Sequence, residues 1–84
     1  MPTSILMPAF SPTMTQGKMV KWLKREGAPV RRGEVIAEVE TDKAILEIEA
    51  TEDGVLGKII ADDGACVEVG QPIAIVEDLP RTNP

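Results

Sequence analysis

The sequence predicts an all-β domain, built as a small sandwich or flattened barrel with a pseudo-two-fold axis. Two observations carry this prediction: the chain repeats itself, and Val and Ile dominate the short runs between its glycines and prolines. Its 84 residues leave room for one small domain. The aliphatic side chains, with eight Val and eight Ile beside the aromatic Phe10 and Trp22, must form the core. With seven Gly and seven Pro the runs are too short for helices, so none is expected.

The repeat has a period of 37 residues, which places residues 17–40 on residues 54–77 with ten identities and no gap. The glycine spacing of ten and then six residues recurs in both copies, at Gly17, Gly27 and Gly33 and at Gly54, Gly64 and Gly70. Because glycine suits backbone positions with positive φ, we expect both copies to turn at these places. Two similar antiparallel units that share one core predict the pseudo-two-fold axis.

Each copy is expected to form a strand, a turn, a short strand, a second turn and a third strand. The first copy has these elements at 19–24, Glu26-Gly27, around Val30, Gly33 and 35–40. The second has them at 55–61, Asp63-Gly64, around Val67, Gly70 and 73–77. Residues 1–78 would form the domain, and residues 79–84, which contain Pro80 and Pro84, resemble the start of a linker.

The segment between the copies predicts a hairpin, because apolar and acidic residues alternate on both sides of Asp42-Lys43. A tight turn there places Thr41 opposite Ala44, Val39 opposite Leu46, Ala37 opposite Ile48, Glu40 opposite Ile45 and Glu38 opposite Glu47. Asp-Lys is not the Asn-Gly or Asp-Gly pair that favours a two-residue hairpin turn. Lys43 would stand at the exposed tip among Glu38, Glu40, Asp42, Glu47 and Glu49. A reachable amine on a long stem suits acylation.

Composition excludes several classes of function. The chain has no His, which removes the usual general base and the commonest metal ligand, so catalytic and metal-ligating residues are not expected. A net charge of −5 is the wrong sign for nucleic-acid binding, and it leaves open a solvated surface or an acidic face for a basic partner. Asp62-Asp63 is expected to be turn chemistry rather than a calcium site.

Cysteine and hydropathy bound the compartment. The single Cys66 cannot form an internal disulfide, which favours a reducing compartment, and a small apolar filler is its expected role. No long apolar run or leader is present in these residues, so no membrane partner is expected.

Glu40-Thr41-Asp42-Lys43-Ala44, between two glycine-spaced repeats, resembles a lipoyl domain of the 2-oxo acid dehydrogenase complexes. The resemblance extends from Ile5 to Glu77. It implies a flattened barrel of two four-stranded antiparallel sheets, with the lysine at a hairpin tip and the termini at the other end. It also implies covalent lipoate on Lys43 and support of the turn by Asp42 and Ala44.

The N-terminal stretch is similar to lipoyl domains of the acetyltransferase component of pyruvate dehydrogenase. The similar residues run from Leu6 to Met14. By this resemblance Phe10, Ser11, Pro12, Thr13 and Met14, together with Glu40, would be recognised by the decarboxylase. Packing against the core is an equal alternative for Phe10 and Met14. Some bacterial decarboxylase β subunits carry a similar domain, so the resemblance leaves the parent chain open.

The mechanism that the resemblance implies is a swinging arm, and the domain would be a substrate of enzymes rather than an enzyme. Lipoate on Lys43 would accept an acetyl group from a thiamine-dependent pyruvate decarboxylase component and deliver it to coenzyme A at the acyltransferase core. Dihydrolipoyl dehydrogenase would then reoxidise it. A lipoate–protein ligase or lipoyl transferase would attach the group. The isolated domain would be a monomer, from the bacterial cytoplasm or the mitochondrial matrix.

Three alternatives to this carrier remain. The lipoyl domain could serve another 2-oxo acid dehydrogenase. A biotin carrier domain shares the fold, but typically has Met on both sides of the modified lysine, where this chain has Asp42 and Ala44. An unmodified acidic binding module would leave the repeat and the tip lysine unexplained.

Overall fold

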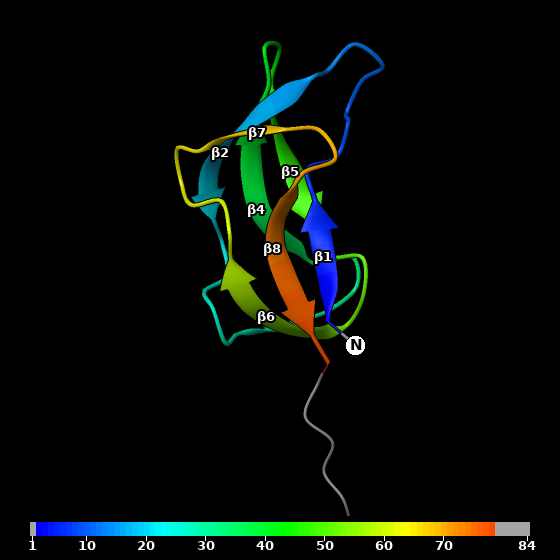
Figure 1. Ribbon diagram of the computed structural model, residues 1–84, viewed down its shortest axis with the longest axis vertical. Helices are drawn as coiled ribbons and strands as arrows, with labels where there is room; N and C mark the ends of the chain where they lie inside the picture. The colour runs from blue at the N-terminus through cyan, green and yellow to red at the C-terminus, as the bar shows by residue number, and fades with distance from the viewer. Residues whose placement is uncertain (1, 79–84) are drawn as a thin grey trace, which may run out of the picture.

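Eight strands form two four-stranded antiparallel sheets in the computed structural model, which describes residues 2–78 (Figure 1). The strands are β1 (Thr3–Leu6), β2 (Gln16–Trp22), β3 (Pro29–Val30), β4 (Val35–Glu40), β5 (Ile45–Glu49), β6 (Gly54–Ile59), β7 (Cys66–Glu68) and β8 (Pro72–Glu77). One sheet has the order β1-β8-β6-β3 and the other the order β5-β4-β2-β7. The described residues contain no helix, so the all-β prediction is confirmed.

The predicted pseudo-two-fold axis exchanges the two sheets. A shift of 37 residues turns β2, β3 and β4 into β6, β7 and β8, and β5 then takes the place of β1. Backbone hydrogen bonds repeat under the same shift: the amide of Gly27 donates to the carbonyl of Leu56 at 2.7 Å, and that of Gly64 donates to Met19 at 2.6 Å. Each copy therefore bonds its own turn to the first strand of the other copy, which interlocks the repeats.

Two of the repeated glycines do not lie in turns, which corrects the prediction from their spacing. Gly27, Gly33, Gly64 and Gly70 have positive φ, as expected. Gly17 and Gly54 lie inside β2 and β6, where a Cβ atom would come 2.7 Å from Cγ1 of Val39 and 2.5 Å from Cγ1 of Val76. These two glycines permit close packing of neighbouring strands rather than a turn.

The first strand of each copy is shifted from the prediction. β2 spans 16–22 rather than 19–24, and β6 spans 54–59 rather than 55–61. The pairing of β2 with β4 shifts register between Met19 and Lys21, so the apolar alternation past that point does not follow a regular strand. β4 has the predicted bounds, and β8 begins one residue earlier than expected, at Pro72. The linker expected over residues 79–84 lies outside the described residues.

The core lies between the sheets and is aliphatic, as composition requires. Its fully buried large side chains belong to Met7, Met19, Val30, Ile36, Val39, Leu56 and Ile73. Several are related by the repeat, including Met19 with Leu56 and Ile36 with Ile73. The described residues leave no charged or polar side chain buried in this core.

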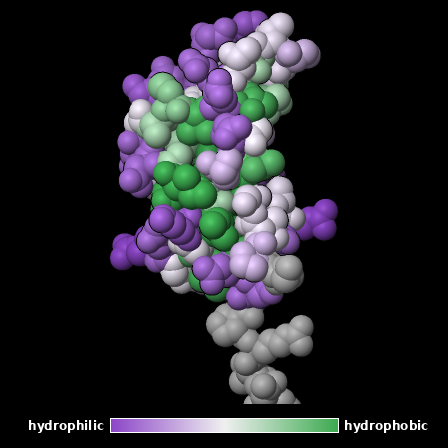
Figure 2. Space-filling view, viewed as in Figure 1, coloured by the Kyte–Doolittle hydropathy of each residue, from purple (hydrophilic) through white to green (hydrophobic). Residues whose placement is uncertain are grey.

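The two ends of the domain differ in their connections. The hairpin between β4 and β5 projects at one end, and the start of β1 and the end of β8 lie together at the other (Figure 1). On the face seen in Figure 2, hydrophobic side chains gather along the middle of the molecule, and hydrophilic ones dominate the end that carries the hairpin tip.

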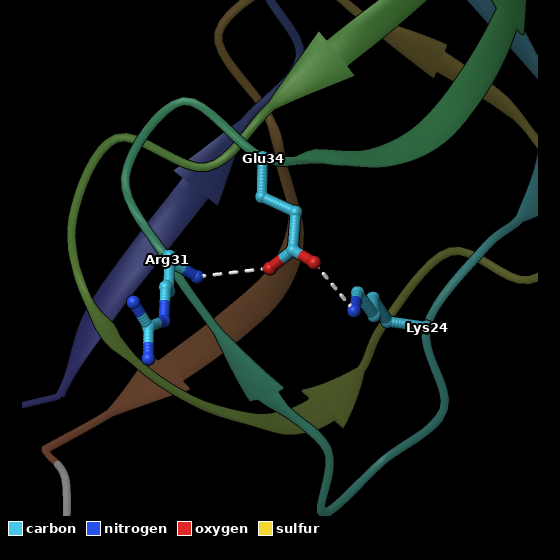
Figure 3. Close-up of polar contacts among 3 residues, drawn as sticks. All are labelled: Lys24, Arg31 and Glu34. Carbon is cyan, nitrogen blue, oxygen red and sulfur yellow. Dashed lines mark hydrogen bonds and ion pairs between the residues drawn. The ribbon is translucent and has the colours of Figure 1, made fainter.

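A polar cluster fixes the turn between β3 and β4 (Figure 3). The carboxylate of Glu34 accepts a hydrogen bond from the backbone amide of Arg31 at 3.0 Å and pairs with Nζ of Lys24 at 2.6 Å. The Lys24 hydrogen bond, followed by the Arg31 amide, lowers the pKa of Glu34 below its ordinary value of 4.5. The cluster holds the loop that leads from the first repeat's turn into β4.

Candidate functional site

The hairpin of β4 and β5 has the predicted register throughout its regular part. Glu40 lies opposite Ile45, Val39 opposite Leu46, Glu38 opposite Glu47 and Ala37 opposite Ile48. Val39 and Ile48 are buried, and the acids project from the sheet. The apolar side of the alternation therefore fixes the register and places Asp42 and Lys43 at the tip.

The turn at the tip closes through the side chain of Thr41. Its backbone amide donates to the carbonyl of Ala44 at 2.8 Å, which ends the ladder. Its hydroxyl donates to the same carbonyl at 2.9 Å and accepts from the amides of Ala44 at 3.2 Å and Lys43 at 3.3 Å. No described non-glycine residue has positive φ, so this is not the primed turn that an Asn-Gly pair would form.

Lys43 is exposed at the end of this turn. Its amine forms no ion pair with any residue that the structure describes, although Glu40 and Asp42 lie close to it in the chain. The lysine side chain is therefore free to extend into solvent, and the tip can present its Nζ to another protein.

The predicted supporting residues act mainly through their backbone. Ala44 contributes its amide and carbonyl to the bonds with Thr41, whereas the exposed carboxylate of Asp42 makes no hydrogen bond within the described part of the chain. Glu40 is exposed and lies opposite Lys18 of β2 as well as Ile45 of β5. Thr41, which holds the turn, is absent from the residues predicted to support it. The sequence signal for this role is a threonine directly before a turn that lacks glycine, because a threonine hydroxyl can accept hydrogen bonds from the amides two and three residues later.

The N-terminal loop between β1 and β2 lies beside the tip. A hollow of about 170 Å³ separates them. It is lined by Phe10, Ser11, Met14, Thr41, Asp42, Lys43, Ala44 and Leu46. The structure thus brings three of the predicted recognition residues next to Lys43.

The loop residues divide into two roles. Met14 is partly buried and packs against the core, whereas Phe10 keeps 37% of its surface exposed. The amide of Phe10 donates to Sδ of Met14 at 3.3 Å, and the amide of Met14 donates to the carbonyl of Ser11 at 3.2 Å. Pro12 and Thr13 are exposed at the loop's end, and Thr13 lines a second hollow of about 470 Å³ beside Thr41 and Asp42. Packing therefore accounts for Met14 and leaves Phe10 available for contact.

Cys66 differs from its expected role as an apolar filler. Its side chain is exposed on β7, opposite Lys18, because the strand alternation turns Val67 toward the core instead. Asp62 and Asp63 serve the repeat's turn: Oδ1 of Asp63 accepts from the amide of Trp22 at 2.9 Å.

Two kinds of site are absent from the described part of the chain. Residues 2–78 hold no cluster of three His, Cys, Asp or Glu side chains able to bind a metal ion. Nor do they hold a helix of the length and hydropathy that crossing a membrane needs.

Comparisons with known proteins agree with this geometry. A family model described as "biotin-requiring enzyme", the biotin/lipoyl model, matches residues 3–76. The chain is 53% identical over 79 residues to the dihydrolipoyllysine-residue acetyltransferase component of the pyruvate dehydrogenase complex of Rickettsia conorii, covering 93% of this chain and 19% of that protein. It is also 53% identical over 77 residues to the pyruvate dehydrogenase E1 component subunit beta of Rhizobium meliloti, covering 90% of this chain and 17% of that one. The chain thus spans about a fifth of the curated relatives it matches.

A solved structure matches this chain over nearly its whole length. The lipoyl domain of the 2-oxoglutarate dehydrogenase complex from Azotobacter vinelandii superposes with a TM-score of 0.74 at 31% identity, covering 92% of this chain and 98% of that domain. Fold, family model and sequence relatives all lead to one assignment: the chain belongs to the biotin/lipoyl family and is a lipoyl domain.

Proposed function

We propose that this chain carries lipoate in amide linkage to Nζ of Lys43 and serves as the acyl carrier of a pyruvate dehydrogenase complex. The observation that carries the proposal is the exposed amine of Lys43 at a hairpin tip whose backbone is fixed by hydrogen bonds. The relatives named as acetyltransferase and E1 β components of pyruvate dehydrogenase support this cargo. An acetyltransferase is the parent chain that we propose.

The residues of the tip fit such a group. Amide formation removes the positive charge of a lysine, and it is least costly where that charge has no partner. Lys43 has none among the described residues. The hollow between the tip and the Phe10 loop leaves space beside the attachment point.

Lipoate, when attached, supplies the thiol and redox chemistry of acyl transfer, and the chain's own residues supply presentation. The hairpin holds Lys43 at the end of the domain opposite the start of β1 and the end of β8 (Figure 1). A tether attached after β8 would therefore leave the tip unobstructed and raise its effective concentration at nearby active sites. The partners that we propose are the attaching ligase or transferase, the decarboxylase component, the acyltransferase core and dihydrolipoyl dehydrogenase.

The test of attachment is an intact mass after incubation with lipoate, ATP and a lipoate–protein ligase. We expect wild type to gain one lipoyl group and Lys43→Gln to gain none. A folded wild type that gains none would refute the proposal. A parallel reaction with biotin and a biotin ligase tests the rival carrier, and biotin on Lys43 in place of lipoate would assign that role instead.

The cargo needs a separate test. The lipoylated domain should be acetylated by the pyruvate decarboxylase component with pyruvate and thiamine diphosphate. The 2-oxoglutarate decarboxylase component with its own substrate should acylate it far more slowly. Equal rates would leave the carrier role standing and remove the assignment to pyruvate.

A further inference from the structure

The tip of the hairpin forms a tight turn without the Asn-Gly or Asp-Gly pair that such turns usually contain. A two-residue hairpin loop normally needs positive φ at its central positions, which Asp and Lys adopt at a cost. Asp42 and Lys43 both keep negative φ. The hydroxyl of Thr41 makes this possible, since it accepts from the amides of Lys43 and Ala44 in place of a backbone carbonyl.

The same hydroxyl also donates to the carbonyl of Ala44, so one side-chain oxygen joins three backbone groups of the turn. Its removal would leave the two amides to water, which is available because Lys43 and Ala44 are exposed. Loss of the hydroxyl would therefore make the turn less ordered and leave the packing of the buried core between the sheets unchanged.

The conformation of the turn determines the direction in which the Lys43 side chain leaves the backbone. The direction of the Cα–Cβ bond of Lys43 follows from its backbone angles, and these are set by the bond from its amide to Thr41. An enzyme that binds the tip must select the ordered form, so its apparent affinity equals its affinity for that form multiplied by the fraction of molecules that adopt it.

We infer that Thr41 is a positioning residue for the acylation of Lys43: its hydroxyl holds the turn in the form that the attaching enzyme binds. The inference rests on the proposed function, because it concerns the enzyme that modifies Lys43. Thr41 does not touch the reacting amine, and its effect is exerted through the backbone of Lys43 and Ala44.

The experiment compares Thr41→Val, which keeps the shape and loses the hydroxyl, with Thr41→Ser, which keeps the hydroxyl and loses the methyl group. Initial rates of lipoylation by the ligase are measured against the concentration of each domain. We expect Thr41→Val to raise the KM for the domain about fivefold, as the loss of one net hydrogen bond implies, with kcat within about twofold of wild type. Thr41→Ser should retain the wild-type KM.

A second readout follows the turn itself. Amide hydrogen exchange in Thr41→Val should accelerate at Ala44 and Lys43 and stay unchanged at Ile36 and Ile73 in the core. Chemical acylation of Lys43 by a small activated ester should be the same in all three proteins, because the amine remains exposed.

Each result separates the inference from the proposed function. A wild type that the ligase does not modify refutes the function. A wild type that is modified, with Thr41→Val at the same KM, overturns the role of Thr41 and leaves the function standing. The role is also overturned if Thr41→Ser loses as much as Thr41→Val, since the methyl group would then carry the effect. If Thr41→Val does not fold, Thr41→Ala, which also lacks the hydroxyl, is measured in its place, and an unchanged KM in that variant overturns the role of Thr41.

Discussion

Oδ1 of Asp63 accepts a hydrogen bond from the backbone amide of Trp22 at 2.9 Å, which ties the turn of the second repeat to the first strand of the first. Its counterpart under the 37-residue shift is Oε2 of Glu26, which accepts from the amide of Ile59 at 2.7 Å. Acidic residues one position before Gly27 and Gly64 thus close each repeat onto the other.

These two carboxylates should contribute similarly to stability. We expect Asp63→Ala to lower the free energy of unfolding by about 1 kcal/mol, while Asp63→Asn, which keeps an acceptor, loses less. Glu26→Ala should lose a comparable amount. Urea unfolding of the single variants and of the double variant measures both effects, and a loss at Asn equal to that at Ala would show that the acceptor is unimportant.

Trp22 makes a second bond across the repeat, from its indole Nε1 to the carbonyl of Ala61 at 2.7 Å. Trp22→Phe keeps most of the ring surface but leaves that carbonyl without its donor, so we expect a loss of about 1–3 kcal/mol in the free energy of unfolding. Thermal unfolding followed by circular dichroism measures it. Ile59→Val, at the related position without such a bond, serves as the control and should cost about 1 kcal/mol. An unchanged stability in Trp22→Phe would contradict the prediction.

Gly54 tests the close approach of β6 and β8. A Cβ atom there would lie 2.5 Å from the carbonyl oxygen of Glu77 and 2.5 Å from Cγ1 of Val76, so Gly54→Ala should cost about 3 kcal/mol. Gly57→Ala in the same strand is the matched control. Its shortest contact, 2.7 Å, is to the mobile end of the Glu77 side chain, and a loss of about 1 kcal/mol is expected. Chemical denaturation should rank the two variants in this order, and the reverse order would contradict the argument.

The position of Lys43 should matter more to its modification than the identity of Asp42. Asp42 makes no hydrogen bond within the described residues, so Asp42→Ala should reduce lipoylation about twofold or less. One residue inserted before Lys43 displaces the amine and breaks the bonds from Thr41, and it should abolish most of the modification. Intact-mass time courses with the ligase compare the two, and equal losses would refute the prediction.

Glu34 gives the domain a pH dependence of known sign. Its folded-state pKa lies below the ordinary 4.5, so its contribution is present above that pH and is lost as the pH falls through the folded-state pKa. Glu34→Gln should therefore be less stable than wild type at neutral pH, and the difference should shrink below pH 4.5. The side chain of Glu34 keeps 37% of its surface exposed, so screening by water keeps the effect small. Urea midpoints at several pH values measure it, with Glu49→Gln, an exposed carboxylate on β5, as the control. A difference that grows on acidification would contradict the sign.

The alternation of apolar and acidic residues predicted the hairpin register because only one face of the hairpin is buried, and the apolar residues must lie on that face. Val39 and Ile48 could not be moved by one residue without turning the acids inward. The bounds of β2 were predicted less well because its pairing with β4 shifts register between Met19 and Lys21, and such a shift depends on the partner strand.

Composition and spacing predicted the environment of a residue less well where its residue type occurs in two kinds of environment. Gly17 was expected to turn, as Gly27 does, but the space needed by Val39 explains it instead. Cys66 was expected to be buried by its apolar neighbours, and the strand phase exposes it. The spacing of residues does not predict the role of Thr41, because its hydroxyl bonds three backbone groups that come together only in the folded turn.

The pseudo-two-fold axis relates the end of the domain that carries the hairpin to the end where β1 starts and β8 stops. Gly33 donates to Ala50 and Gly70 donates to Met7, so β1 stands to β8 as β5 stands to β4. The turn with Lys43 connects β4 to β5. Its counterpart in the other sheet is the gap between Glu77 at the end of β8 and Pro2 before β1, which no turn connects. Joining those ends and cutting the chain at Asp42-Lys43 would give a circular permutant with the same sheets. Closing that gap with a Thr-Asp-Lys-Ala turn while keeping the hairpin intact would make a cyclic backbone with two exposed lysine turns, one at each end of the domain.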